Sequence, residues 1–188
     1  MSNSLLPAWK LREARRCLHS GGVIAYPTEA VYGLGCDPLD PQAVARLFWL
    51  KGRAPEKGVI LVASAIEQLA PYIRVDEKTT RELEKSWPGP VTWVVPAATD
   101  VPAWITGGRD TVAVRVTAHP IASDLCTAFG GALVSTSANT SGKEPARNPL
   151  QVRQRLRHLP DMIVYGATGK LDRPTEIRDA TSGILLRA

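Results

Sequence analysis

Short apolar runs alternate with segments of helical spacing along this sequence, and the alternation restricts the chain to an α/β fold. The apolar runs lie at residues 23–26, 59–63, 91–95, 111–116 and 132–135. The helical segments lie at residues 7–20, 41–52, 76–86 and 120–130, with a further one around Arg153. Strands that alternate with helices form a sheet covered by helices. Because no Pro/Gly/Ser-rich linker divides the 188 residues, we predict one domain over residues 1–188.

Helix and turn signals set the boundaries of these elements. Asp40 can cap a helix that has Pro41 at its first position. Ser64 and Glu67 fit a capping box, which predicts another helix after the strand at 59–63. Residues 175–180 and 183–187 predict a hairpin. The Pro/Gly-containing loop at 96–109 is long enough to close over a site.

Polar side chains follow the strand ends, where ligands bind in open α/β sheets. Thr28 begins a glycine-punctuated loop at 28–35, and small hydroxyl, amide and glycine residues at 135–142 follow a later strand. Lys51 and Arg53 lie where the second helix ends. A triphosphate needs cations and close backbone N–H donors, so both patches are candidates for a nucleotide site. The alternative for the basic pair is simple capping of the helix C-terminus.

A period of two in residues 111–116 places Thr111, Ala113 and Arg115 on one face of a strand and three valines on the other. An arginine that projects from a sheet beside a threonine is either solvated or holds an anion. Arg115 is therefore a candidate anion-binding residue.

The net charge of +5 permits an anionic partner. A helix around Arg155 would place Arg153 and Arg157 on one face. We favour a solvated face there over an RNA contact, although RNA would use the same residues. The five tryptophans are scattered along the chain, so we expect packing in the core and at turns, rather than stacking on bases, to explain most of them.

Missing motifs exclude several chemistries. The sequence lacks the G-x-S-x-G elbow, the G-x-x-x-x-G-K-[ST] loop, the G-x-G-x-x-G fingerprint and any zinc-ligand spacing. Its cysteines, Cys17, Cys36 and Cys126, are odd in number and far apart, which is typical of reduced cytosolic thiols. No segment approaches ~18 consecutive apolar residues, and no secretory signal precedes the first helix. We therefore predict a cytoplasmic protein without a membrane partner.

Ordered motifs along the chain resemble the YrdC family. They are Y-P-T-E-A-V-Y-G-L-G-C-D from Tyr26, K-G-R from Lys51, W-P-G-P-V-T from Trp87, T-V-A-V-R-V from Thr111, S-T-S-A-N-T-S-G from Ser135 and E-I-R-D from Glu176. The similarity spans residues 23–187 and is greatest to short bacterial threonylcarbamoyl-AMP synthases. It implies a three-layer α/β fold, in which a twisted mixed sheet has helices on both faces and a deep basic cleft.

The resemblance also implies a reaction and a site. L-threonine, bicarbonate and ATP would give L-threonylcarbamoyladenylate, pyrophosphate and water, for threonylcarbamoyladenosine (t6A) at position 37 of tRNAs that read codons beginning with A. The residues implied to bind ATP are Lys51, Arg53, Lys57, Thr111, Ser137, Asn139, Arg147 and Arg187, with Lys51 and Arg53 also expected to be catalytic. The residues implied to contact threonine or bicarbonate are Thr28, Arg115, Ser137 and Thr175.

The chain departs from the family pattern at a few positions. Lys57 stands where longer relatives have an asparagine, and Val62 stands where they have a histidine, so that Val62 cannot donate to threonine. Arg147 lies near a nucleotide-contact position but replaces a small hydroxyl residue. Glu29 is the acidic residue nearest to Thr28, and we favour a structural hydrogen bond for it over a role as general base. Any lid is expected to come from within the domain.

The resemblance implies several partners besides the substrates ATP, L-threonine and bicarbonate. Mg²⁺ is expected to arrive with ATP and to need no dedicated protein ligands. The other expected partners are bacterial t6A-forming proteins and tRNA or double-stranded RNA at the basic cleft. The competing hypothesis is an RNA-binding module without catalysis. Hydrogenase-maturation proteins that carry a YrdC-like domain add zinc-finger and acylphosphatase segments, for which this chain has no room.

Overall fold

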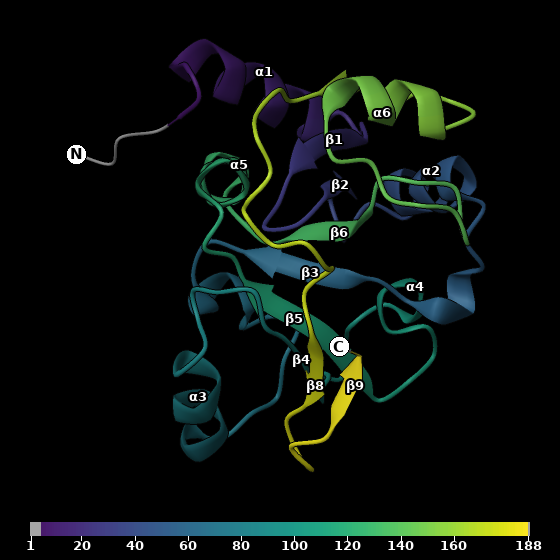
Figure 1. Cartoon of the computed structure of the whole chain (residues 1–188). Helices are drawn as coiled ribbons and strands as arrows, with labels where there is room; N and C mark the ends of the chain where they lie inside the picture. Colours follow the sequence, from purple (N-terminus) through teal and green to yellow (C-terminus); the bar gives the residue numbers. More distant parts are fainter. Residues whose placement is uncertain (1–4, 188) are drawn as a thin grey trace.

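The computed structural model describes residues 5–187, so the outermost residues of the predicted domain, 1–4 and 188, lie outside the described part. Its α-helices are α1 (Ala8–His19), α2 (Pro41–Lys51), α3 (Glu77–Glu84), α4 (Ala103–Thr106), α5 (Pro120–Phe129) and α6 (Pro149–Arg155) (Figure 1). The 3-10 helices are η1 (Pro55–Lys57) and η2 (Ile66–Leu69). The strands are β1 (Ile24–Pro27), β2 (Tyr32–Gly35), β3 (Ile60–Ala63), β4 (Thr92–Pro96), β5 (Thr111–Val116), β6 (Leu133–Ser137), β7 (Met162–Ile163), β8 (Ile177–Asp179) and β9 (Leu185–Arg187).

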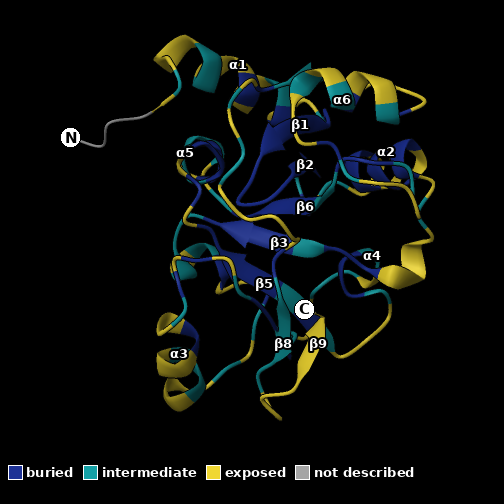
Figure 2. Ribbon diagram, in the orientation of Figure 1, coloured by how far each residue is buried: buried dark blue, intermediate teal, exposed yellow. Residues whose placement is uncertain are grey.

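Within the described residues the strands form one mixed, nine-stranded sheet. The order across the sheet is β7-β1-β2-β6-β3-β5-β4-β8-β9. The pairs β1–β7, β3–β5 and β4–β8 are parallel, and the remaining neighbours are antiparallel. The central strands are buried, whereas the outer faces of the helices are exposed (Figure 2).

Helices cover both faces of the sheet, because successive side chains of a strand point to opposite sides. Ile24 and Tyr26 pack in one hydrophobic cluster with residues of α1 and α5. Val23 and Ala25 pack in the other cluster, with residues of α2, α3 and α6. The result is the predicted α/β fold with three layers.

The glycine-punctuated segment predicted as a loop contains a strand, β2, which pairs with β1 and β6. Glycine is depleted in strands, so the sequence pattern did not indicate this element. Gly35 is required here by close packing, since a Cβ atom would lie 2.6 Å from the Val134 carbonyl oxygen and 2.7 Å from Cε1 of Tyr26. Gly35 therefore allows β2 to lie close to β1 and β6.

The capping-box prediction at Ser64 is wrong. The segment forms only the short 3-10 helix η2, whose N-cap residue is Ala65. The Ser64 hydroxyl instead donates to Oε1 of Gln68, at 3.0 Å. Asp40, by contrast, caps α2 as predicted, because its Oδ1 accepts from the backbone N–H groups of Gln42 and Ala43.

The predicted basic face around Arg155 is shorter than expected. Helix α6 ends at Arg155, so Arg157 is not part of the helix. Arg153 lies over the ring of Tyr165, 5.5 Å from its centroid, and donates to its hydroxyl. The tryptophan prediction holds for most of the five, since Trp87 and Trp93 are buried and Trp104 packs against the core, whereas Trp9 and Trp49 are exposed.

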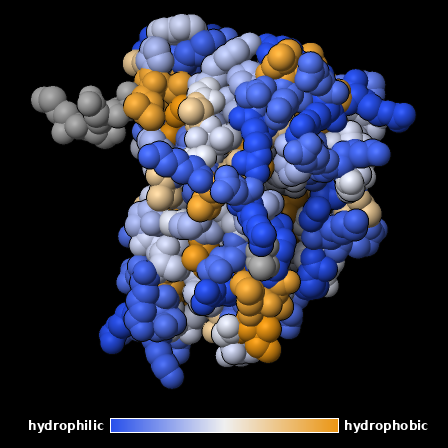
Figure 3. Space-filling view, viewed as in Figure 1, coloured by the Kyte–Doolittle hydropathy of each residue, from blue (hydrophilic) through white to orange (hydrophobic). Residues whose placement is uncertain are grey.

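The predicted C-terminal hairpin is confirmed by the antiparallel pair β8–β9. The hairpin extends the sheet through the parallel pairing of β8 with β4. Ile184, Leu185 and Leu186 leave an exposed apolar patch on it (Figure 3). Among the described helices, none is both long and apolar enough to cross a membrane.

Candidate functional site

A pocket of about 370 Å³ lies on the sheet face that α1 and α5 cover only in part. Strand alternation explains its position. Val62 and Leu133 point toward the α1–α5 cluster, and Ile60 and Ser135, two residues away on the same strands, line the pocket. The helices therefore cover one end of this face, and the pocket occupies the other.

Strand β5 supplies much of the pocket floor, as its alternation predicts. Thr111, Ala113 and Arg115 line the pocket, while the intervening valines are buried in the opposite cluster. Ala113 pairs with Ile60 of β3, and Ile60 pairs with Ser135 of β6. This row of paired residues joins β6, whose residues 135–137 carry hydroxyl groups, to β5 through β3.

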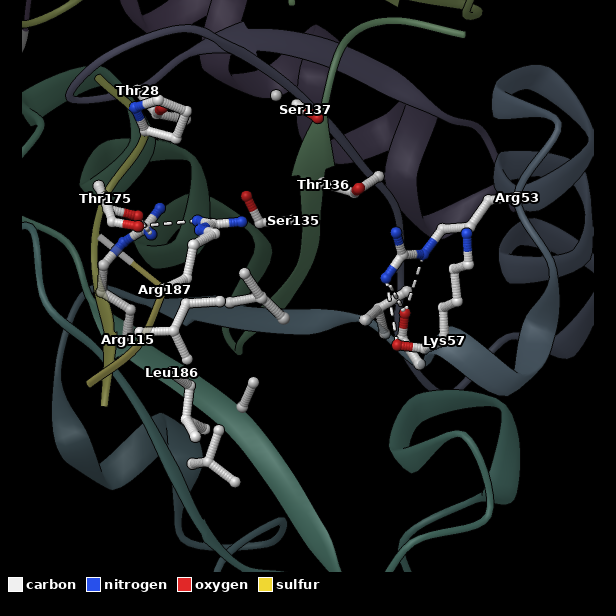
Figure 4. Close-up of a pocket in the computed structure, with 18 of the residues that line it drawn as sticks. Thr28, Arg53, Lys57, Arg115, Ser135, Thr136, Ser137, Thr175, Leu186 and Arg187 are labelled. Carbon is white, nitrogen blue, oxygen red and sulfur yellow. Dashed lines mark hydrogen bonds between the residues drawn. The ribbon is translucent and has the colours of Figure 1, made fainter. Parts of the chain in front are cut away.

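Basic side chains stand on opposite sides of the pocket (Figure 4). Arg53 and Lys57 lie on one side, and Arg115 and Arg187 lie on the other with Thr175. The hydroxyl residues 135–137 of β6 lie between the two sides. Arg109 also lines the pocket, and none of its lining residues in the described chain is acidic. The arrangement suits a ligand with anionic groups at two positions.

Arg53 is held in place by the chain that follows it. Its Nε and Nη2 atoms both donate to the carbonyl of Gly58, at 3.1 and 2.9 Å, and Nη2 also donates to the carbonyl of Lys57. Burial, with the nearby charges of Arg109 and Arg187, lowers the pKa of the Arg53 guanidinium. Concentrated positive charge of this kind favours an anion.

Arg115 is the most enclosed cation of the pocket, at 4% exposure. Its Nη1 donates to the hydroxyls of Thr92 (3.0 Å) and Thr175 (2.8 Å). Glu29 supplies the opposite charge, with Oε2 3.5 Å from Nη2 of the arginine. Arg115 is thus paired and buried, which rules out the solvated interpretation of this residue.

Thr175 and Thr28 bring two further hydroxyls to the same end of the pocket. The Thr28 hydroxyl donates to the Val31 carbonyl at 2.8 Å, so its oxygen can still accept a hydrogen bond. Thr175 is positioned from both sides, because Nη2 of Arg187 donates to its carbonyl at 2.7 Å and Arg115 donates to its hydroxyl.

Lys51 does not line the pocket, although the sequence motif places it beside Arg53. It is 3% exposed, and its ammonium donates to the backbone carbonyls of Ser137 and Asn139 and to both of their side-chain oxygens. Burial, followed by the charge of Arg53, lowers the pKa of Lys51 to about 7. The structure therefore uses Lys51 to hold the 137–139 loop.

Asn139 and Arg147 also lie outside the pocket lining. Asn139 is buried, accepts from Lys51 and donates to the carbonyls of Thr140 and Lys143. Arg147 donates to the carbonyls of Ala30, Leu171 and Asp172. Both side chains join segments that border the pocket.

The structure thus brings together at the pocket most of the residues that the sequence singled out. They are Thr28, Arg53, Lys57, Thr111, Arg115, Ser137, Thr175 and Arg187. Sequence reasoning did not select Arg109 as a site residue, although it ends the loop that was expected to close over a site. Arg109 donates to the Glu56 carbonyl, and so reaches the segment that carries Lys57.

A metal site built by the protein is not evident in the described residues, which hold no group of three or more His, Cys, Asp or Glu side chains placed for an ion. The cysteines are free, and Cys36 and Cys126 are buried. The pocket lining offers hydroxyl oxygens and cations. Its chemistry is therefore that of anion binding and positioning.

The fold and the pocket define an α/β protein with a basic small-molecule site. A sequence model described as "Telomere recombination", for the Sua5/YciO/YrdC family, matches residues 16–188. The chain belongs to this family.

Related proteins agree with this assignment. The chain is 55% identical to a threonylcarbamoyl-AMP synthase of Alkalilimnicola ehrlichii over 100% of both chains, and 54% identical to one of Halorhodospira halophila over 95% of this chain and 94% of the other. The P. abyssi Sua5 structure complexed with L-threonine superimposes with a TM-score of 0.90 at 36% identity, covering 97% of this chain. The matched region is 54% of that Sua5 chain, about half of its length.

Proposed function

We propose that this protein is a threonylcarbamoyl-AMP synthase. It would convert L-threonine, bicarbonate and ATP to L-threonylcarbamoyladenylate, pyrophosphate and water. The observation that carries the proposal is the presence of cations on two opposite sides of one pocket. Buried Arg115 lies on one side, and Arg53 and Lys57 lie on the other, with residues 135–137 of β6 between them. Relatives at 54–55% identity that carry this name support it.

The amino acid is assigned to the Arg115 side of the pocket. A guanidinium binds a carboxylate through two parallel hydrogen bonds. Arg115 is the most buried cation of the pocket, so few water molecules compete for these bonds. Thr28, Thr175 and Ser137 provide hydroxyls for the remaining polar groups of threonine and for bicarbonate. A Sua5 relative has been solved with L-threonine, which supports an amino-acid site in this fold.

The nucleotide is assigned to the Arg53 side. Arg53, Lys57 and Arg109 would neutralise phosphates, Thr111 lines the pocket floor, and Arg187 would contact the nucleotide from the Arg115 side. Lys51 and Asn139 contribute by fixing the loop that presents Ser137. Arg147 supports the site in the same indirect way, through the carbonyls of residues 30, 171 and 172.

The reaction requires that its reactants be positioned and that the charge of their anionic groups be neutralised. The threonine amine adds to the carbon of CO₂, or to that of bicarbonate with loss of water, and gives up a proton to form a carbamate. A carbamate oxygen then attacks the α-phosphorus of ATP while pyrophosphate leaves. Because the carbamate decomposes in water, a site that holds the reactants together and excludes solvent supplies the main catalytic advantage. A pocket lined by cations and hydroxyls is suited to this task.

Mg²⁺ fits this site as part of the nucleotide. The pocket lining in the described residues has no carboxylate to hold the ion, so phosphate oxygens and water would be its ligands. When bound, Mg²⁺ would neutralise phosphate charge. Ser137 and Arg53 would then position the phosphates from the protein side.

The unstable product requires a receiver, and we propose the t6A-forming proteins and tRNA as the partners that consume it. This function would place the protein in the cytoplasm, together with tRNA. The competing possibility is binding of tRNA or double-stranded RNA at the basic pocket without catalysis, which predicts salt-dependent RNA binding and no turnover of ATP.

Pyrophosphate release distinguishes these possibilities. The assay contains ATP, Mg²⁺ and bicarbonate, with L-threonine, with L-serine or with no amino acid. Strong dependence on L-threonine is expected. Equal release with serine or without an amino acid would refute the threonine assignment, and RNA binding without any release would favour the binding module.

A further inference from the structure

Glu29 and Arg115 each keep one buried polar atom without a hydrogen-bond partner in the described residues. These atoms are Oε2 of Glu29 and Nε of Arg115. The two side chains are 8% and 5% exposed and belong to one ion pair. Buried polar atoms are nearly always hydrogen-bonded, so two unpaired atoms in one ion pair call for an explanation.

Thr117 explains why the Glu29 carboxylate stays apart from the arginine. The hydroxyl of Thr117 donates to Oε1 of Glu29 at 2.5 Å. The same hydroxyl oxygen accepts from the backbone N–H of His119, at 3.1 Å. The carboxylate is fixed by this contact, and its Oε2 remains 3.5 Å from Nη2 of Arg115.

Arg115 is anchored on the opposite edge of its guanidinium. Nη1 donates to the hydroxyls of Thr92 and Thr175, whereas Nε has no partner in the described residues. The edge formed by Nε and Nη2 is one that a carboxylate can bind with two parallel hydrogen bonds. In this protein Glu29 balances the charge beside that edge without forming those bonds.

We propose that Glu29, held by Thr117, is a positioning residue that neutralises Arg115 and leaves its Nε–Nη2 edge for the α-carboxylate of the amino-acid substrate. The inference rests on the proposed function, in which Arg115 binds that carboxylate. A buried guanidinium without a counter-charge is costly, and a direct bidentate bond to Glu29 would occupy the substrate's donors. The Thr117 contact avoids both problems.

Two substitutions are expected to change threonine binding in opposite directions. Glu29→Gln keeps an acceptor for Thr117 but removes the negative charge, so substrate no longer shares Arg115 with another carboxylate and its Kd falls. Thr117→Val releases the carboxylate to bond directly to Arg115, and the Kd for threonine rises about tenfold or more. The double variant has no carboxylate to occupy the edge, so its Kd returns to the wild-type value or below.

Titration calorimetry with L-threonine in the absence of ATP measures these changes, and L-threoninamide, which lacks the carboxylate, is the control ligand. The Kd for L-threoninamide should not fall in Glu29→Gln or rise in Thr117→Val as the Kd for L-threonine does. A purely structural role for Glu29 would weaken threonine binding in both single variants, and that result would overturn the inference.

The failure of this inference is separable from the failure of the proposed function. If the wild-type protein binds no threonine, the proposed function is wrong and the inference falls with it. If the wild type binds threonine and Thr117→Val does not weaken it, only the inference is overturned. If Glu29→Gln does not fold, Thr117→Val decides the matter through its two ligands: a loss of affinity confined to L-threonine supports the inference, and an equal loss for L-threoninamide overturns it.

Discussion

The ammonium of Lys51 lies 2.7 Å from the side-chain oxygen of Asn139, so the K-x-R and S-x-N motifs are joined by a buried hydrogen bond. The same ammonium also contacts the carbonyl and hydroxyl oxygens of Ser137. Two motifs that are 86 residues apart along the chain thus form one structural unit at the pocket wall.

Replacing Lys51 with methionine should reduce both stability and nucleotide binding. The change leaves buried carbonyls of Ser137 and Asn139 without this donor, which should lower the free energy of unfolding by about 1–3 kcal/mol. Urea unfolding and calorimetric titration with a non-hydrolysable ATP analogue measure the two effects. Lost nucleotide binding with unchanged stability would instead indicate a direct contact between Lys51 and phosphate.

Arg53→Ala should weaken ATP binding more selectively. Loss of a charge-assisted phosphate contact corresponds to about 1.5–3 kcal/mol, or roughly tenfold to a hundredfold in Kd. Threonine binding should change little, because Arg53 lies on the side of the pocket opposite Arg115. An unaltered affinity for ATP in this variant would contradict the assignment.

Arg109 tests a residue that the structure adds to the site. Arg109→Ala should raise the KM for ATP by about two- to tenfold and weaken its dependence on ionic strength, because the loop cation acts mainly through charge. Arg81→Ala is a matched control, since Arg81 is an exposed arginine of α3 that pairs with Glu77 and does not line the pocket. Equal effects of both substitutions would show that only net charge matters.

His119 should make the stability of the protein depend on pH under mildly acidic conditions. Burial lowers the pKa of its imidazole below the ordinary value of 6.5, and Nε2 donates to the Ala167 carbonyl at 3.1 Å. The unfolded chain then binds more protons than the folded one below pH 6.5, so this contribution is full above 6.5 and is lost as the pH falls toward the folded pKa. Thermal unfolding from pH 7.5 to 5 should show a smaller loss for His119→Gln, and identical pH profiles would contradict the assignment.

Local patterns predicted much of this fold, because its helices have clear ends and its strands have simple alternation. Asp40 caps α2, and β5 directs Arg115 to the pocket face and its valines to the core. Strand β2 was not predicted, because the need for Gly35 arises from close packing against Tyr26 and Val134, which a local pattern does not contain. The capping-box prediction was wrong because the Ser64 hydroxyl donates to the side chain of Gln68 instead of capping a helix.

The site was predictable as a set of residues but not as a set of roles. The motifs singled out Lys51 and Arg53 together, yet side-chain direction at the end of α2 buries the first and leaves the second at the pocket. The partnership of Arg115 with Glu29 joins residues far apart in sequence and needs the folded sheet to become visible.

The β8–β9 hairpin gives one wall of the pocket to the last residues of the described chain. Leu186 and Arg187 line the pocket, and Arg187 is held by the Thr175 carbonyl. Insertions or deletions in the turn between β8 and β9 would therefore shift this wall, so that sequence changes at the turn alter the site without replacing a residue that lines it.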